Sequence, residues 1–259
     1  MSDWLHSLPV VWMAVVIFLA TYVVTSAIYW IVVRLAVGER VKGFKAVSPG
    51  LLPPLGIIFG LLVAFLASQA WGDVERAHTA VNHEASALRG VVLLAEVFPH
   101  ESSERIRGLI RAHIQQAQSA EWPEMARREV NLTMIPESLA HALQVAVATP
   151  VEGPGQIAAQ REIITGLENA LDARRQRILI SDSQMNLVKW TTLVIMGMCF
   201  LVMVAIVHCD NQLALRLALG SFATAIAISI VLIVAHDRPF TGQNAVRPSP
   251  LLQVLPNPE

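Results

Sequence analysis

Charged residues are scarce in this chain of 259 residues. Asp, Glu, Lys and Arg together make up 15% of it, and 54% of the residues are hydrophobic. A soluble domain carries about 25% charged residues, so this composition is typical of a membrane protein. The formal net charge is only −1. The basic residues are scattered rather than clustered, and the sequence therefore gives no electrostatic case for nucleic-acid binding.

Cysteines and groups suited to catalysis are also few. Cys199 and Cys209 are the two cysteines, and ten residues of helix would separate them by about 15 Å, too far for a disulfide bond. His78 and His83 do not share a helix face, so with Glu84 they make a poor metal site. No nucleophile has a recognisable base beside it, and no phosphate-binding glycine motif occurs. We expect no enzyme, no bound metal and no cofactor.

Long apolar runs are the dominant feature of the sequence. A helix needs about 17–25 residues to cross a bilayer. Four charge-free runs meet this length, at residues 10–33, 51–72, 190–207 and 217–235. The first is too long for a signal peptide and lacks a basic flank before it. No carboxylate lies inside a run, which argues against a proton relay. The sequence predicts an all-α integral membrane protein with four transmembrane helices.

The runs divide the chain into four parts. We expect a first transmembrane pair in residues 1–72, a helical extramembrane domain in 73–189, a second pair in 190–235 and a proline-rich tail in 236–259. The tail should be extended, either lying on a surface or disordered.

Helices of the polar domain are predicted from apolar residues that recur every seven positions. They form two stripes, at Val74, Val81, Leu88 and Ala95, and at Ile157, Ile164, Leu171 and Ile178. Between them, "SSERIRGLIRAHIQQAQ" predicts an amphipathic helix with Ser102 or Ser103 as its N-cap. A further helix should begin near Pro136.

The second apolar run carries two strips of residues spaced four apart. Small residues form one strip, which suits close packing between membrane helices: Gly56, Gly60 and Ala64, continued by Ser68. Bulky residues form the neighbouring strip: Ile57, Leu61 and Phe65, followed by the polar Gln69. If copies pack around an axis through the small strip, the bulky strip becomes a hydrophobic constriction that gates ions by dewetting. Ser68 and Gln69 would then lie at its inner mouth. The alternative is that the bulky strip faces lipid or fills a helix bundle.

Several motifs follow this run, and together with it they resemble a known family. They are "ERA" at 75–77, "NHEASALR" at 82–89, "EWPEM" at 121–125, "ARRQR" at 173–177 and "HDRPFTG" at 236–242. With the second run they resemble the prokaryotic bestrophin-like family of four-span membrane proteins. That family is in turn distantly similar to the bestrophins.

The resemblance implies a function and a topology. Bestrophins are pentameric, chiefly anion-conducting channels whose second span lines a hydrophobic neck. The matching strip here is Ile57, Leu61 and Phe65. The resemblance thus implies a homo-oligomer, expected to be a pentamer, that conducts anions through a bacterial inner membrane. The termini and the helical domain would be cytoplasmic, an orientation that the scattered basic residues do not decide. No acidic cluster resembles the bestrophin calcium clasp.

Asp237 and Arg238 follow the fourth run and are candidates for coupling the helical domain to the membrane. Arg238 would pair with Glu75 or Glu84; alternatively, Asp237 and Arg238 pair locally. Expected partners are further copies of the chain, membrane lipids and permeant ions. Two other functions fit the same pattern of spans. One is a membrane sensor or scaffold that signals through its helical domain without conducting ions, and the other is a subunit of a stator-like complex.

Overall fold

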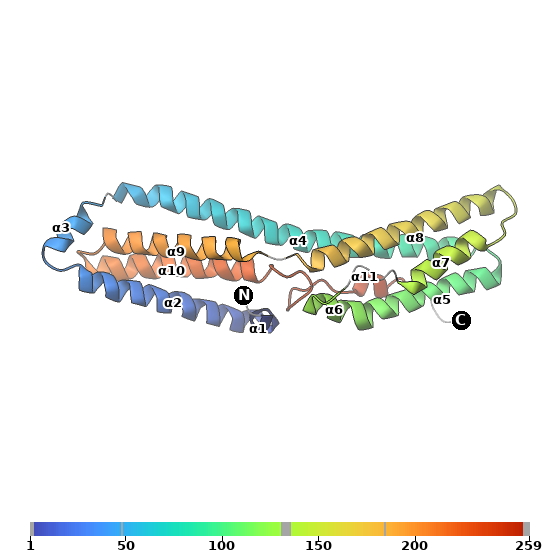
Figure 1. The fold of residues 1–259 in the computed structure, drawn as a ribbon, viewed down its shortest axis with the longest axis horizontal. Coiled ribbons are helices and arrows are strands. Elements are labelled where there is room, and N and C mark those ends of the chain that lie inside the picture. The colour runs from blue at the N-terminus through green and yellow to red at the C-terminus, as the bar shows by residue number, and fades with distance from the viewer. Residues whose placement is uncertain (1–2, 48, 131–135, 184, 256–259) are drawn as a thin grey trace. The chain divides into compact units, whose positions relative to one another are not determined.

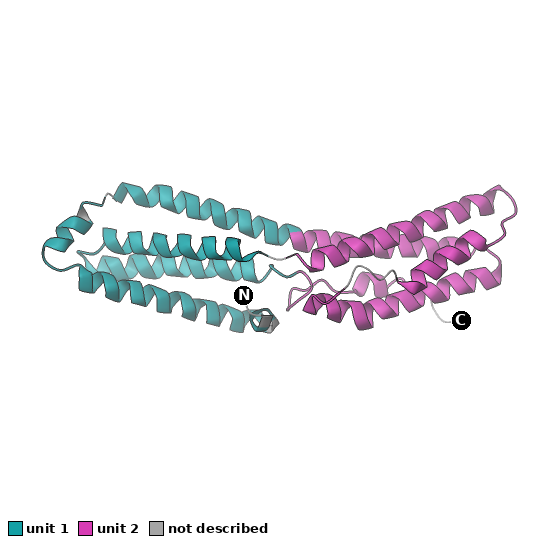
Figure 2. Ribbon diagram, in the orientation of Figure 1, with its two compact units in different colours: residues 1–72, 184–238 teal, residues 73–183, 239–259 magenta. Residues whose placement is uncertain are grey.

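The structure is a computed structural model that describes residues 3–47, 49–130, 136–183 and 185–255. It is 81% helical, and these ranges contain no strand, which confirms the all-α prediction. The chain divides into two compact units (Figure 2). Unit 1 comprises residues 1–72 and 184–238, and unit 2 comprises residues 73–183 and 239–259.

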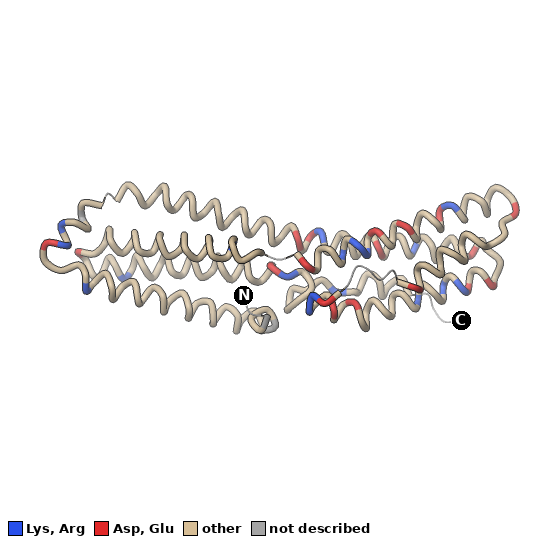
Figure 3. Tube along the Cα trace, viewed as in Figure 1, with Lys and Arg blue, Asp and Glu red and all other residues tan. Residues whose placement is uncertain are grey.

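Unit 1 contains the apolar helices (Figure 1). Four helices of the described residues are long and apolar enough to cross a membrane, as predicted: α2 (Val10–Leu35), α4 (Leu52–Ala95), α9 (Leu187–Val207) and α10 (Gln212–Val234). Two short helices, α1 (Asp3–Ser7) and α3 (Glu39–Lys45), precede α2 and follow it. The 3₁₀ turn Pro49–Leu51 leads into α4. The apolar stretches are almost free of charged residues (Figure 3).

Asparagine side chains fix where the last two spans begin. The Asn186 Oδ1 atom accepts a hydrogen bond from the backbone N–H of Lys189 at 3.0 Å. Asn211 caps α10 in the same way, accepting from the N–H groups of Leu213 and Ala214. These bonds satisfy donors that the first turn of a helix otherwise leaves unpaired.

Among the residues that the structure describes, unit 2 holds the second half of α4 and six further helical segments. They are α5 (His100–Gln116), the π-helical turn η2 (Ala117–Glu121), α6 (Trp122–Arg127), α7 (Glu137–Ala148), α8 (Pro154–Ser181) and α11 (Ser249–Leu252). Pro136 stands at the N-cap of α7, close to the predicted start. The predicted cap of α5 is wrong: the helix begins earlier, after Pro99, and no side chain caps it. A proline at the start of a helix costs no hydrogen bond, because the first N–H groups have no partner within the helix.

The two predicted apolar stripes differ in how well they describe the core of unit 2. On α4, Val81, Leu88 and Ala95 are all buried, as expected. On α8, Ile178 is buried whereas Ile157 is exposed. The face of α8 that packs inward is instead made of residues three and four apart: Ile163, Leu167, Ala170, Arg174 and Arg177. Because two of its members are arginines, an apolar pattern does not reveal this face.

The proline-rich tail contributes to the core of unit 2. Phe240, Val246, Leu251 and Val254 are buried in the same apolar cluster as the helices. The Thr241 hydroxyl also donates a hydrogen bond to the carbonyl oxygen of Ala126 at 3.0 Å. The described part of the tail is therefore packed, and the expectation of an extended, surface-lying or disordered segment does not hold for these residues.

Gly166 marks a close approach of α8 to α4, and its replacement gives a stability prediction. A Cβ atom at this position would lie 2.7 Å from the Val91 Cγ2 atom, and a β-branched side chain has little freedom to move away. We expect Gly166→Ala to lower the free energy of unfolding by about 1–3 kcal/mol. Thermal melting in detergent measures the change.

Gly108→Ala on α5 is the matched control. A Cβ atom at position 108 would meet nothing within 4 Å, so this variant should be more stable by up to about 1 kcal/mol. Equal effects at the two sites would contradict this close packing.

Candidate functional site

The membrane-spanning part of α4 is the least buried of the four spans. Only 6% of its most apolar stretch is buried within the chain, against 28% in α2, 39% in α9 and 33% in α10. The three bulky residues of the predicted constriction are strongly exposed: Ile57 by 63%, Leu61 by 66% and Phe65 by 64%. An apolar surface of this kind must be covered by lipid or by another chain.

The opposite side of α4 packs against its own unit. Phe59, Leu66 and Ala70 are buried there, and the Phe59 ring stacks on Phe200 of α9 with a centroid separation of 6.1 Å. Because a helix advances 100° per residue, Leu61 and Phe65 lie on the far side from Phe59. The bulky strip therefore points away from the rest of unit 1.

The predicted small strip is shared between two environments. A Cβ atom at Gly56 would lie 3.5 Å from the Phe200 ring, so Gly56 packs within the chain. A Cβ at Gly60 would meet nothing within 4 Å, and Ala64 is exposed. Gly60 and Ala64 thus remain available for contact with a second chain, whereas Gly56 is already in contact with α9.

The two residues of the predicted inner mouth point in different directions. Ser68 is exposed beside the bulky strip. Gln69 lies one residue further round the helix, and its Oε1 atom accepts a hydrogen bond from the Lys189 Nζ atom at 2.7 Å. Two residues further along α4, the Trp71 ring stacks on His236 with a centroid separation of 5.4 Å. Gln69 and Trp71 therefore join α4 to the ends of α9 and α10.

Asp237 is buried at the end of α10. Its Oδ1 atom accepts a hydrogen bond from the backbone N–H of Met185 at 2.9 Å, and its Oδ2 atom lies 4.0 Å from the His6 Nε2 atom. This carboxylate thus holds the segment before α9 and the N-terminal helix α1 against α10. Glu75 is exposed, and the pairing of Arg238 with an acid of α4 stays a prediction.

Unit 2 encloses a cluster of charged residues that the sequence did not reveal. Arg177 of α8 is fully buried. Its Nε atom donates to Glu84 of α4 at 2.8 Å, and its Nη2 atom donates to Glu84 at 3.2 Å and to Glu121 at 2.9 Å. Glu121 also accepts from the Arg174 Nε atom at 2.8 Å. The Arg177 guanidinium lies over the Trp122 ring, 4.4 Å from its centroid, where a cation is attracted to the π electrons.

His113 of α5 completes this cluster. Its Nε2 atom lies 2.9 Å from the Glu84 Oε1 atom. Its Nδ1 atom is buried and has no hydrogen-bond partner among the described residues. The cluster thus pairs two carboxylates, Glu84 and Glu121, with two guanidiniums, and His113 adds a polar contact to Glu84.

The charges of the cluster hold one another ionised. Burial raises the pKa of Glu84, but the positive charge of Arg177 and the hydrogen bond from His113 outweigh it and leave that pKa below its usual value. Glu121 behaves alike: burial is outweighed by Arg177 and Arg174, so its pKa is also lowered. Burial lowers the pKa of Arg177, but Glu84 and Glu121 together raise it by more, so the pKa of Arg177 lies above its usual value. The cluster is therefore a fixed set of ion pairs.

Four of the motifs that carry the family resemblance meet in this part of unit 2. Glu84 comes from "NHEASALR", Glu121 and Trp122 from "EWPEM", and Arg174 and Arg177 from "ARRQR". From "HDRPFTG", Phe240 packs edge-on against the Trp122 ring, 6.0 Å between centroids. The π-helical turn η2 ends at Glu121, next to Trp122, and both residues contact the Arg177 guanidinium. A shift from α- to π-helix often marks such a specialised position.

The cluster could have been found in the sequence by a search for charged residues at the three- and four-residue spacing that marks the buried face of a helix. Glu84 lies between Val81 and Leu88 at three- and four-residue spacing, and Arg177 continues the line from Ala170 and Arg174. Such positions face a neighbouring helix whatever their side chain. A charged residue at one of them must find an opposite charge, since an unpaired buried ion is too costly. The buried, paired geometry suits a structural anchor rather than a catalytic centre.

These observations define an integral membrane protein with four spans and a second, helical unit built around buried ion pairs. A family model described as "Bestrophin-like domain" matches residues 19–251. The chain therefore belongs to the bestrophin-like family, which confirms the resemblance drawn from the motifs. No curated protein and no solved structure matches the chain.

Proposed function

We propose that the chain forms a homo-oligomeric ion channel, in which several copies of α4 surround an axis and turn Ile57, Leu61 and Phe65 toward it. One observation carries the proposal: the three bulky residues share the outward face of the least buried span. Rings of such side chains make a dry constriction, which blocks ions until it widens or wets. The exposed Ser68 would lie at one end of it.

Membership of the bestrophin-like family supports the finer features of this proposal. Because this family is similar to the bestrophins, we propose that the channel contains five copies of the chain and prefers anions. We also propose that it lies in a bacterial inner membrane with its termini in the cytoplasm. Gly60 and Ala64 would permit close contact between neighbouring copies of α4, because small residues let membrane helices approach.

Single-channel recording in planar bilayers tests the constriction. Leu61→Ala removes bulk from the proposed ring, so we expect the single-channel conductance to rise severalfold, and Phe65→Ala should act in the same direction. The matched control is Leu19→Ala on α2, because Leu19 has the same 66% exposure as Leu61 but lies on another span. Reversal potentials in a KCl gradient then report whether chloride is preferred. If both leucine variants behave like the unaltered protein, the strip does not line the path.

Cysteine labelling distinguishes a water-filled path from a lipid-facing surface. Single cysteines at positions 57, 61 and 65, in a background without Cys199 and Cys209, should react with a small water-soluble thiosulfonate, whereas a cysteine at position 19 should not. Mass photometry in detergent gives the subunit number independently. A monomer would exclude a central pore. A ring that carries no current across a range of ions would favour the membrane scaffold instead.

A further inference from the structure

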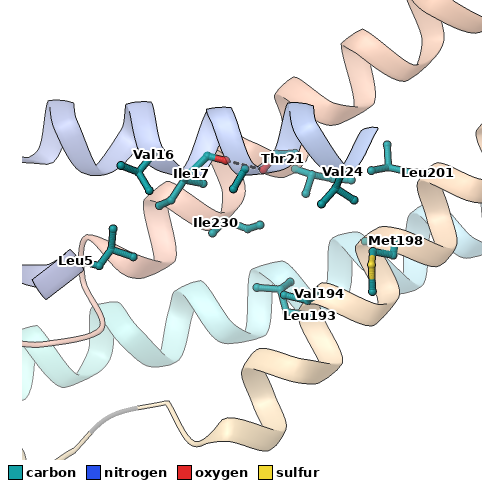
Figure 4. Close-up of a pocket in the computed structure, with 13 residues that line it drawn as sticks. Leu5, Val16, Ile17, Thr21, Val24, Leu193, Val194, Met198, Leu201 and Ile230 are labelled. Atoms are coloured by element: carbon teal, nitrogen blue, oxygen red, sulfur yellow. Dashed lines mark hydrogen bonds between the residues drawn. The ribbon is translucent and has the colours of Figure 1, made fainter. Parts of the chain in front are cut away.

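Unit 1 contains an apolar pocket apart from the proposed pore face. It has a volume of about 270 Å³ and lies between α2, α9 and α10, with Leu5 of α1 among its lining residues. Figure 4 shows side chains from these helices turned toward the space. Leu5 is itself buried, next to His6 and its neighbour Asp237.

The pocket is elongated along two facing helices. On α2 its lining residues are 16, 17, 20, 21 and 24, and on α9 they are 193, 194, 197, 198 and 201. The two sets have the same spacing, which places each on one helix face over two turns. Eight residues of helix correspond to about 12 Å. Small residues, Ala20 and Gly197, stand in the middle of the two sets.

Nothing in the pocket would hold water. Its lining consists of apolar residues and Thr21, whose hydroxyl already donates to the carbonyl oxygen of Ile17 at 2.8 Å. A cavity needs several polar partners to retain a water molecule, and a dry cavity of about 150 Å³ already binds benzene. This pocket is larger and equally apolar, so its natural occupant is a hydrocarbon.

The mouth of the pocket opens on the outer surface of the spans. Val24, Val194 and Met198 line it and are each more than a third exposed. In unit 1, α2 packs on α9 and α10, and α4 packs on α9 through Phe59 and Phe200. Figure 1 shows α2 and α4 on different sides of this pair. If copies gather around α4, as proposed above, the mouth faces the bilayer rather than a neighbouring copy.

We propose that this pocket binds one acyl chain of a membrane phospholipid, which enters between α2 and α9. The chain would fill the space along both helices toward Leu5. Leu5 lines the pocket, and the next residue, His6, lies 4.0 Å from Asp237. An acyl chain bound against Leu5 would therefore stabilise the contact between α1 and the end of α10. Only the choice of lipid over a second copy depends on the proposed channel arrangement; the pocket itself does not.

Photolabelling of the full chain in vesicles tests the site. The vesicles contain phosphatidylethanolamine and phosphatidylglycerol, with increasing amounts of a phosphatidylcholine that carries a diazirine in its acyl chain. We expect labelling of residues 193–201 to saturate with the probe and to be competed by unlabelled phospholipid. Val24→Phe, which fills the mouth, should reduce this labelling severalfold. Val23→Phe, at the neighbouring exposed position that does not line the pocket, should leave it unchanged.

Each other result has a definite meaning. Labelling that rises linearly with the probe, or that is equal in the two phenylalanine variants, would overturn the proposal, because the probe would then report bulk lipid. Absence of label in the unaltered protein, together with loss of the oligomer in Val24→Phe, would show that a second copy covers the mouth. The unaltered protein gives the decisive saturation curve even if Val24→Phe does not fold. Channel currents are not read in this experiment, so its failure leaves the pore proposal standing.

Discussion

Replacing Arg177 by alanine is expected to destabilise unit 2 by about 3–5 kcal/mol, because it leaves two buried carboxylates without their shared cation. Glu84 would keep only His113, and Glu121 would keep only Arg174. The stacking on Trp122 would also be lost. Thermal melting in detergent measures the total loss. Hydrogen–deuterium exchange of α8 peptides shows whether the loss lies in unit 2.

Two variants control this experiment. Arg175→Ala removes the exposed arginine two positions earlier, and its effect should stay within about 0.5 kcal/mol. Arg177→Lys keeps the positive charge but loses the planar fork that reaches both carboxylates. Its loss of stability should therefore lie between those of Arg177→Ala and Arg175→Ala. If Arg177→Ala melts like Arg175→Ala, the buried ion pairs described for the cluster do not form.

Acid is expected to unfold unit 2 through the same cluster. The pKa values of Glu84 and Glu121 lie below the ordinary value of 4.5 in the folded protein. Burial raises each pKa, but Arg177 together with the other partner, His113 for Glu84 and Arg174 for Glu121, lowers it by more. A lowered pKa contributes stability that is fully present above the unfolded value and is lost as the pH falls through the folded value. The free energy of unfolding should therefore be steady from neutral pH to about pH 5 and fall steeply below 4.5.

Melting temperatures measured between pH 7 and pH 3 test this dependence. Glu121→Gln removes one of the two titrating groups, so the variant should start less stable at neutral pH and show a shallower acid loss. Glu101→Gln, at an exposed position of α5, should keep the full slope. A slope unchanged by Glu121→Gln would mean that other groups govern the acid transition.

The local patterns of the sequence were sufficient for the membrane-spanning helices. Runs without charge mark both ends of α2, α9 and α10, and the start of α4, within a few residues, because a helix in hydrocarbon can carry almost no ionised side chain. The helix α4 itself continues beyond its run to Ala95. The four-residue spacing also placed Ile57, Leu61 and Phe65 on one face of α4, and their common exposure agrees with that placement. Whether this face lines a pore depends on other copies of the chain, which a single sequence does not arrange.

Patterns based on hydrophobicity were least informative in unit 2. They missed the inward face of α8, because its seam carries Arg174 and Arg177, and they gave the tail no place in the core, although Phe240 and Val246 are buried. Glu84 was a candidate to couple to Arg238, and in the structure it pairs with Arg177 and His113. The heptad register can indicate that a charged residue faces a neighbouring helix, but it does not indicate which residue of that helix pairs with it.

The sequence by itself determined the helical class, the four spans and the family, because each depends on local composition or on short motifs read along the chain. Only the tertiary structure decided that four of those motifs meet around Arg177 and that α4 turns its bulky face outward. It also decided that a dry pocket lies between α2, α9 and α10. The physical reason is that ion pairs and cavities arise between segments far apart in the sequence, 29 positions for His113 and Glu84 and 93 for Arg177 and Glu84. Local periodicity contains no information about contacts over such separations.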